Sequence, residues 1–206
     1  MARIAIIGTG RMATGLAAGW AARGHEVVLG SRDPAARAEV LARASGATLA
    51  GIDAALEDAE VVVLAIPFAA VEPFARARAA QLQGRLVIDI SNPFGHLPDN
   101  RIAGAEITAA AIGPGARVVA AFKDNFWQTL AQPVGPHGIV RDVHFAGDNE
   151  ADKRIVTRLI EDLGFRPIDC GPLKNARVLD AMVPLMLELD ERYNARARTS
   201  SWKFLV

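Results

Sequence analysis

Short apolar runs alternate with alanine-rich or amphipathic segments along most of this chain. The apolar runs predict strands at residues 2–7, 26–29, 47–49, 61–66, 86–90 and 116–122. Such short, continuous runs are typical of strands that are buried on both faces. The segments between them predict helices at residues 12–22, 34–44, 53–59, 68–80 and 102–112. This alternation with short links predicts an α/β fold, a Rossmann-like, doubly wound and mainly parallel sheet.

The pattern loosens after residue 122. We expect a helical turn at 124–130, a strand at 140–146, a helix at 150–163, a strand at 166–169 and a long helix at 175–194. The last helix is apolar on more than one face, so it is either buried in its own domain or forms a two-fold interface, and we favour a homodimer. The chain is thus expected to hold one large domain over residues 1–170 and a small C-terminal helical extension over residues 171–206.

Composition and charge exclude several classes of partner. Lys plus Arg and Asp plus Glu are both 23 in 206 residues, so zero net charge gives no case for nucleic acid. The longest apolar stretch, residues 61–71, is about half the length of a membrane helix and contains Pro67. We therefore expect a cytoplasmic protein with no membrane partner. Cys170 is the single cysteine and the four histidines are scattered, so we expect no metal site.

A glycine-rich turn follows the first predicted strand and opens the first predicted helix. It reads Gly8-Thr9-Gly10-Arg11-Met12-Ala13. Gly8 permits a tight turn, Gly10 allows close approach of a pyrophosphate, and the helix N-terminus offers amide hydrogens and partial positive charge. In this context the motif predicts dinucleotide binding, although a tight turn that binds nothing has the same form.

The end of the second strand predicts which dinucleotide binds. Enzymes that use NAD usually place Asp or Glu there to hold the ribose diol. Here the chain reads Gly30-Ser31-Arg32, and Asp33 is expected to cap the following helix. Ser31 and Arg32 can bind a 2′-phosphate, with Arg37 adding charge one turn later, so we predict NADP. The alternative is that Arg32 is a solvated loop charge.

Further candidates lie at the carboxyl ends of other strands, where open α/β sheets bind ligands. They are Ile66, Pro67 and Phe68, then Asn92, and then Ala121. Pro67 and Phe68 can wall the pyrophosphate and nicotinamide, and Asn92 can hydrogen-bond a carboxamide. Each also fits a strand-ending turn without a ligand.

The sequence resembles the NADPH-dependent reductases of the deazaflavin coenzyme F-420, and it is also similar to the ferric-reductase-type cytosolic domains of some membrane oxidoreductases. The resemblance covers nearly the whole chain. It rests on IAIIGTGRMATGLA, GHEVVLGSRDP, VVVLAIPF, the DISNP strand end, RVVAAF and the C-terminal GPLKNARVLDAMVPLMLEL ending in WKFL. The resemblance implies a Rossmann-like domain whose C-terminal part closes over the nicotinamide, and a homodimer.

Matching motif positions imply that NADP is held by Thr9, Gly10, Arg11, Met12, Ser31 and Arg32, with Ile66 and Pro67 near its pyrophosphate and ribose. The implied reaction is hydride transfer between NADP(H) and a flat tricyclic small-molecule acceptor, either the deazaflavin or a flavin such as FMN or FAD. Such transfer depends on stacking and orientation more than on a general acid, and no catalytic residue is assigned.

One segment departs from the family pattern. The deazaflavin reductases have a small apolar turn after the sixth strand, whereas this chain reads Lys123-Asp124-Asn125-Phe126-Trp127. We expect this segment to face the acceptor, with Phe126 or Trp127 either stacking on its ring or packing in the core. Two other functions remain open: an NADPH-dependent imine or small-molecule reductase, and a non-catalytic NADPH-binding redox sensor.

Overall fold

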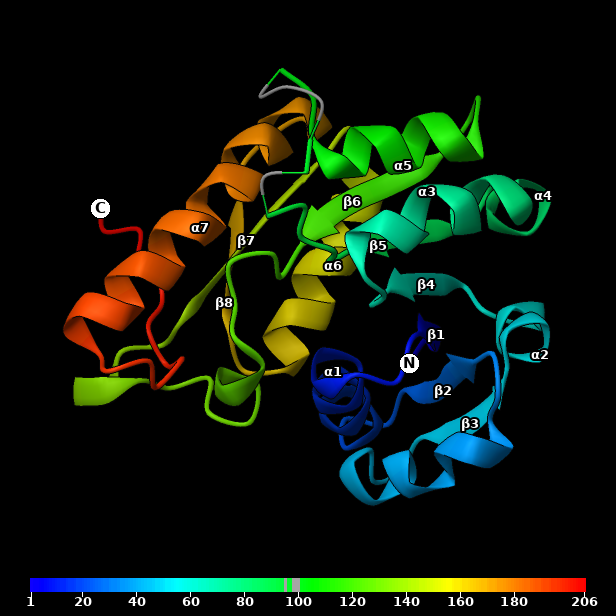
Figure 1. Ribbon diagram of the computed structural model, residues 1–206, viewed down its shortest axis with the longest axis horizontal. Helices are drawn as coiled ribbons and strands as arrows, with labels where there is room; N and C mark the ends of the chain where they lie inside the picture. Colours follow the sequence, from blue (N-terminus) through cyan, green and yellow to red (C-terminus); the bar gives the residue numbers. More distant parts are fainter. Residues whose placement is uncertain (95, 98–100) are drawn as a thin grey trace.

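One eight-stranded sheet runs through the computed structural model, which describes residues 1–94, 96–97 and 101–206 (Figure 1). The strand order is β3-β2-β1-β4-β5-β6-β7-β8. The first six strands are mutually parallel, β7 is antiparallel to β6, and β8 is parallel to β7. The strands are β1 (Arg3–Ile7), β2 (Glu26–Ser31), β3 (Thr48–Gly51), β4 (Val61–Leu64), β5 (Leu86–Asp89), β6 (Arg117–Ala121), β7 (Asp142–Gly147) and β8 (Arg166–Asp169). The doubly wound, mainly parallel sheet predicted from the sequence is therefore confirmed.

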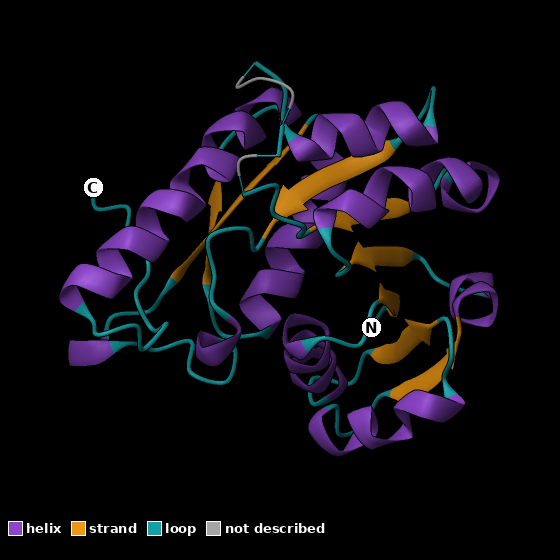
Figure 2. Ribbon diagram, viewed as in Figure 1, coloured by secondary structure: helices purple, strands orange, loops and turns teal. Residues whose placement is uncertain are grey.

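Helices cover both faces of this sheet (Figure 2). The α-helices are α1 (Arg11–Ala21), α2 (Ile52–Glu57), α3 (Phe68–Ala77), α4 (Ala79–Leu82), α5 (Gly104–Ile112), α6 (Glu150–Asp162) and α7 (Ala176–Tyr193). The 3-10 segments are η1 (Ala35–Arg43), η2 (Trp127–Thr129), η3 (Pro136–Gly138) and η4 (Leu173–Asn175). Two prolines and a glycine also predict a loop at 91–100, and residues 95 and 98–100 of it lie outside the described residues.

Alternating side chains of each central strand enter two separate cores. Ile4 and Ile6 of β1 pack on the face covered by α1 and α6, whereas Ala5 and Ile7 pack on the face covered by α2, α3, α5 and α7. Because helices cover both faces of these parallel strands, the side chains on both faces are buried and must be apolar. This explains why the strands appear in the sequence as continuous apolar runs and not as alternating apolar and polar residues. Leu179 of α7 belongs to the second core, so the C-terminal helix shares the core of the large domain. The domain boundary at residue 170 stays a prediction.

Two predicted helices differ in the structure. The segment predicted as a helix at 34–44 is the 3-10 segment η1, interrupted at Arg37 (φ −127°, ψ 15°). Val40 is its one buried residue, so little packing is available to stabilise a full α-helix. The helix predicted at 68–80 ends at Ala77 because Arg78 leaves helical geometry (φ −121°, ψ 21°), and α4 follows separately.

Candidate functional site

The glycine-rich turn lines a cleft of about 570 Å³ at the carboxyl edge of β1, β2 and β4, which we call the glycine-turn cleft. The strand order reverses between β1 and β4, and open α/β sheets bind ligands at such a switch point. The cleft brings together eight predicted site residues: Gly8, Thr9, Gly10, Ser31, Arg32, Arg37, Ile66 and Pro67. These eight come from three segments that are remote in the sequence, at the ends of β1, β2 and β4, as predicted from the ends of the strands.

The two glycines of the turn have different physical roles. Gly8 has φ +126°, and a Cβ there would lie 2.3 Å from the carbonyl oxygen of Ala65, so glycine is required for the fold itself. A Cβ on Gly10 would have no atom within 4 Å. Gly10 also precedes α1, whose first amides donate no capping hydrogen bond to a described side chain, and the first turn has no acidic residue. The open space and the uncapped helix end fit an anionic group such as a pyrophosphate.

The end of β2 presents cationic side chains to the same cleft. Arg32 and Arg37 both line it, and neither forms an ion pair with a described residue. Asp33 is engaged locally, since its Oδ1 accepts a hydrogen bond from the amide of Ala36 at 3.1 Å, the capping contact expected from the sequence. Ser31 is 8% exposed, and its hydroxyl oxygen accepts from the amide of Asp33 at 3.2 Å. The arrangement has unneutralised guanidinium groups and fits a phosphate on the ribose.

A second cavity of about 310 Å³ opens beyond the first turn of α1, next to the carboxyl ends of β5 and β6. We call it the aromatic cavity, and its lining comprises Met12, Asn92, Phe94, Lys123, Asn125, Phe126, Trp127, Gln128, Val183, Met186, Leu187 and Arg198. Asn92 donates through Nδ2 to the carbonyl oxygen of Lys123 at 2.8 Å, while its Oδ1 is buried without a described partner. That oxygen fits an amide or ring N–H of a ligand.

The remaining predicted site residues lie elsewhere. Arg11 stacks on Trp127, with its guanidinium carbon 4.4 Å from the ring centroid, on the flank of α1 outside the glycine-turn cleft. Phe68 lies against α5, where a Cβ on Gly104 would be 2.9 Å from its ring. Ala121 has no exposed surface and belongs to the core beneath α1 and α6.

Lys123 and Asp124 of the segment after β6 are buried, and Lys123, Asn125, Phe126 and Trp127 of that segment line the aromatic cavity. Whether the segment faces the acceptor stays a prediction. Lys123 is 1% exposed and its Nζ lies 2.9 Å from Oδ1 of Asp180. Asp124 is 2% exposed and its carboxylate lies 2.7 Å from Nδ1 of His144. Burial lowers the pKa of His144, but the hydrogen bond and charge of Asp124 outweigh it and the net effect raises that pKa. The segment thus presents its two aromatic rings, and no carboxylate, to the aromatic cavity.

The residues that the C-terminal part contributes to this cavity were not predicted from the sequence. Val183, Met186 and Leu187 come from α7, and Arg198 comes from the segment that follows it. The apolar pattern of α7 was visible, but it does not distinguish a cavity wall from an interface. Arg198 follows the last predicted helix and carries no recognisable motif.

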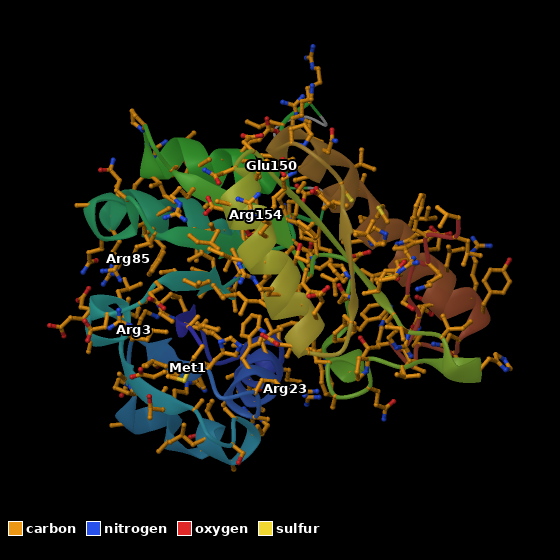
Figure 3. All side chains as sticks on the ribbon, turned by 180° about the vertical axis from the view of Figure 1, so that it is seen from behind. Met1, Arg3, Arg23, Arg85, Glu150 and Arg154 are labelled. Carbon is orange, nitrogen blue, oxygen red and sulfur yellow. The ribbon has the colours of Figure 1, made fainter. Side chains whose placement is uncertain are left out.

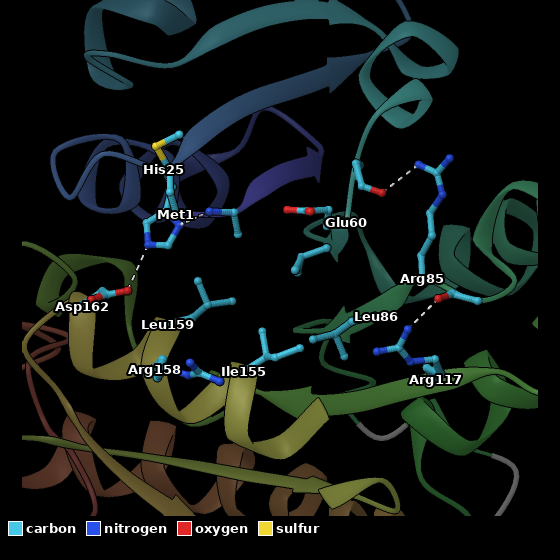
Figure 4. A pocket seen from close by; sticks show the side chains of 14 residues that line it. Met1, His25, Glu60, Arg85, Leu86, Arg117, Ile155, Arg158, Leu159 and Asp162 are labelled. Atoms are coloured by element: carbon cyan, nitrogen blue, oxygen red, sulfur yellow. Dashed lines mark hydrogen bonds and ion pairs between the residues drawn. The ribbon is translucent and has the colours of Figure 1, made fainter. Parts of the chain in front are cut away.

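A third cavity of about 600 Å³, the rear cavity, lies at the amino ends of the strands and is approached from the side shown in Figure 3. Two of its arginines, Arg85 and Arg117, donate hydrogen bonds to backbone carbonyl oxygens (Figure 4). Arg85 donates to the carbonyl oxygens of Leu56, Glu57 and Ala59, which end α2, and Arg117 pairs with Asp152. Ligands of this fold bind at the opposite edge, so we assign the rear cavity no function.

The described residues form neither a metal-binding cluster nor a membrane-spanning helix. Within residues 1–94, 96–97 and 101–206, no three His, Cys, Asp or Glu side chains are grouped so as to hold a metal ion. In the same part of the chain, every helix is too short or too polar to cross a membrane.

Comparison with known proteins identifies relatives over the whole chain. The family model described as NADP oxidoreductase, coenzyme F420-dependent, matches residues 3–93. The F420-dependent NADP reductase of Methanothermobacter marburgensis is 30% identical over 221 positions, covering 94% of this chain and 95% of that protein. The metalloreductase STEAP3 of Rattus norvegicus is 32% identical over 90% of this chain, which corresponds to 37% of that protein.

Solved structures agree with these relatives. A provisionally assigned F420-dependent NADP reductase of Arthrobacter sp. FB24 superposes with a TM-score of 0.89 at 27% identity, covering 100% of both chains. An imine reductase of Aspergillus terreus has a TM-score of 0.70 at 18% identity and shares the fold, with this chain covering 63% of its length. The cleft at the glycine turn, the NADP-type end of β2 and the full-length likeness lead to one assignment: this chain belongs to the family of F420-dependent NADP reductases.

Proposed function

We propose that this protein transfers a hydride between NADP(H), bound in the glycine-turn cleft, and a deazaflavin bound in the aromatic cavity. The observation that carries the proposal is the placement of the two sites. Gly10 lines the cleft and Met12, two residues later, lines the cavity, so both sites open around the first turn of one helix. Hydride transfer requires two planar rings in contact, and adjacent sites supply that proximity.

The residues of the glycine-turn cleft fit NADP. Thr9, Gly10 and the free amides at the start of α1 are proposed to hold the pyrophosphate, and Ser31, Arg32 and Arg37 the 2′-phosphate. Ile66 and Pro67 are proposed to cover the ribose side, as both line the cleft. When bound, the nicotinamide supplies or accepts the hydride, and these side chains fix its position.

The aromatic cavity suits an acceptor ring more than an acid–base reaction. Among its described lining residues there is no histidine and no carboxylate. Phe126 is half-buried and Trp127 is 40% exposed, so neither ring is packed in the core. Arg11 covers one face of Trp127, and the ring surfaces that line the cavity are proposed to stack on the acceptor. Asn92 is proposed to orient the carboxamide or an edge of the acceptor through its unpartnered oxygen.

We also propose a homodimer formed through the outer face of α7. Val178, Met182, Leu185 and Leu189 follow one another at spacings of four, three and four, and therefore form one stripe. Val178 is 61% exposed and Leu185 50%. Helices commonly pack against each other through a continuous apolar stripe of this kind. In the proposed dimer, a two-fold axis relates the α7 helices of the two identical chains. A cytoplasmic location stays a prediction from the sequence.

Anaerobic mixing of the protein with NADPH and each acceptor tests the proposed reaction. We expect NADPH to bleach the visible absorbance of the deazaflavin, and FMN and FAD serve as parallel arms. Rapid reduction of FMN or FAD alone would reassign the acceptor. Tight NADPH binding without oxidation by any acceptor would contradict an enzymatic function and favour a redox sensor.

A further inference from the structure

We infer that Arg198 forms an anion subsite at the aromatic cavity, which recognises a negatively charged tail on the hydride acceptor. The inference rests on the proposed function, since it concerns the acceptor of the same reaction. It adds a specificity-determining residue: Arg198 is expected to make acceptors with a phosphate or carboxylate tail better substrates than the same ring without one.

The charge balance of the cavity supports this inference. Two cationic side chains line it, Lys123 and Arg198, and no described carboxylate does. The charge of Lys123 is balanced within the protein, because its Nζ lies 2.9 Å from Asp180 and 3.9 Å from Asp89. Among the described lining residues, Arg198 is therefore the cation that an incoming ligand meets.

Asp190 holds Arg198 without fully neutralising it. The closest approach of its carboxylate to the guanidinium is 3.8 Å, longer than a hydrogen bond. Both oxygens of Asp190 are already engaged, because Oδ1 accepts from Asn194 and from the amide and hydroxyl of Ser200, and Oδ2 accepts from the amide of Arg198. The carboxylate thus fixes the backbone at Arg198 and leaves much of the guanidinium charge available.

The guanidinium of Arg198 is held in position by two contacts, and two of its nitrogens make no hydrogen bond with a described residue. Its Nη1 donates to the carbonyl oxygen of Leu187 at 3.3 Å, and its carbon lies 5.7 Å from the ring centroid of Phe126. Its Nε and Nη2 make no hydrogen bond with any residue that the structure describes, and the side chain is 29% exposed. A guanidinium with two donors free and its plane held by a ring matches the geometry of a carboxylate or phosphate.

The backbone around Arg198 is unusual for non-glycine residues. Ala195, Arg196 and Arg198 have φ of 47°, 62° and 57°. Left-handed conformations cost free energy, and such residues persist where surrounding contacts fix them, often at ligand sites. Here the buried carboxylate of Asp190 supplies those contacts, so Arg198 occupies a built position in the cavity wall.

The test compares two acceptors that share one ring. The KM for coenzyme F420, which carries an anionic tail, and for its tail-free deazaflavin riboside is measured with the full-length protein at saturating NADPH. We expect wild type to have a lower KM for the tailed coenzyme than for the riboside. Arg198→Gln is expected to reduce the ratio of the KM for the riboside to the KM for the tailed coenzyme about tenfold. Raising the salt concentration is expected to reduce the same ratio in wild type and to have little effect in the variant.

Arg192→Gln is the matched control, since Arg192 lies on exposed α7 surface and pairs with Glu188. It is expected to keep the wild-type ratio. An Arg198→Gln variant that keeps the ratio, or one that weakens both acceptors equally, would overturn the tail subsite while leaving the proposed reaction intact. Wild-type protein that turns over neither deazaflavin would overturn the proposed function and the subsite together.

Discussion

The ammonium nitrogen of Lys123 lies 2.9 Å from Oδ1 of Asp180, and both side chains are buried. Lys123 follows β6, and Asp180 lies in the second turn of α7. The other oxygen of Asp180 accepts a hydrogen bond from the amide of Gly104 at the start of α5. Asp89, at the end of β5, is fully buried nearby and accepts from Ser91 and Thr108. This cluster fixes α7 to the strand ends that surround the aromatic cavity.

Removing the lysine is expected to leave buried carboxylates without a counter-ion. Lys123→Met should lower the free energy of unfolding by about 3–5 kcal/mol, since breaking a buried pair is much more costly than deleting both partners. Urea denaturation measures this change. The double variant Lys123→Met with Asp180→Asn should lose less than the sum of the two single losses. A loss below about 1 kcal/mol in Lys123→Met would contradict the role of the cluster.

The choice of NADP over NAD should depend on the arginines at the end of β2. Arg32→Ala is expected to raise the KM for NADPH about 10- to 100-fold with little effect on NADH, because hydrogen bonds to a charged phosphate contribute roughly 1.5–3 kcal/mol. Arg37→Ala should act in the same direction. Steady-state kinetics with both cofactors measure the preference, and exposed Arg23 gives the control variant. An unchanged NADPH/NADH preference in Arg32→Ala would refute the assignment.

The two glycines of the turn should respond differently to alanine. Gly8→Ala places a Cβ against the carbonyl of Ala65 at φ +126°, so we expect a loss of stability of at least about 2 kcal/mol. Gly10→Ala meets no protein atom, so it should cost about 1 kcal/mol or less in stability yet weaken NADPH binding at least tenfold. Thermal unfolding and NADPH fluorescence titration separate the two effects. Normal NADPH affinity in Gly10→Ala would place the pyrophosphate elsewhere.

Acid should weaken the attachment of the C-terminal segment. Burial alone would raise the pKa of Asp142, but hydrogen bonds from Arg166, Lys203 and the amide of Phe204 outweigh it and lower the pKa to about 2. The stabilisation is therefore fully present above the ordinary value of 3.8 and is lost as the pH falls toward 2. The shift corresponds to about 2 kcal/mol.

Asp142→Asn should show a correspondingly smaller loss of stability between pH 5 and pH 2 than wild type, measured by urea denaturation across that range. Asp58→Asn, at an exposed carboxylate, is the control and should follow the wild-type curve. Parallel pH profiles for wild type and Asp142→Asn would show that the hydrogen bonds from these three residues do not stabilise the charged form.

The proposed dimer depends on the stripe of α7. Leu185→Arg is expected to shift the sedimenting species from twice the chain mass of 21.9 kDa to a single chain at micromolar concentration. Leu41→Arg changes an exposed apolar residue outside α7 and should leave the dimer intact. A wild-type protein that sediments as one chain would rule out the interface.

Local sequence patterns, namely apolar runs, capping residues and turn glycines, were enough to predict most of the fold. The strand at 166–169 was predicted with the bounds of β8, and Asp33 caps the next segment as its position before Pro34 suggested. The tight turn at Gly8 was also expected, because a short turn between a strand and a helix requires glycine at this position. These features depend on neighbours in the sequence, where patterns are informative.

The interior of the site could not be predicted in the same way. A lysine and an aspartate after a strand look like solvated charges, and nothing near Lys123 reveals that Asp180 is its partner. Trp127 was expected either to stack or to pack, and its contact with Arg11 depends on how η2 lies beside α1. Such contacts join residues that are far apart in the sequence, and local patterns of apolar and polar residues do not reveal them.

The C-terminal segment has a consequence for how acceptor preference can change. The glycine-turn cleft is built from segments within residues 7–74, whereas α7 and Arg198 supply part of the wall of the aromatic cavity. Buried carboxylates hold residues 194–206 in place, so the exposed side chains there are free to vary without loss of the attachment. Substitutions in this last stretch are therefore expected to change the aromatic cavity while leaving the glycine-turn cleft as it is.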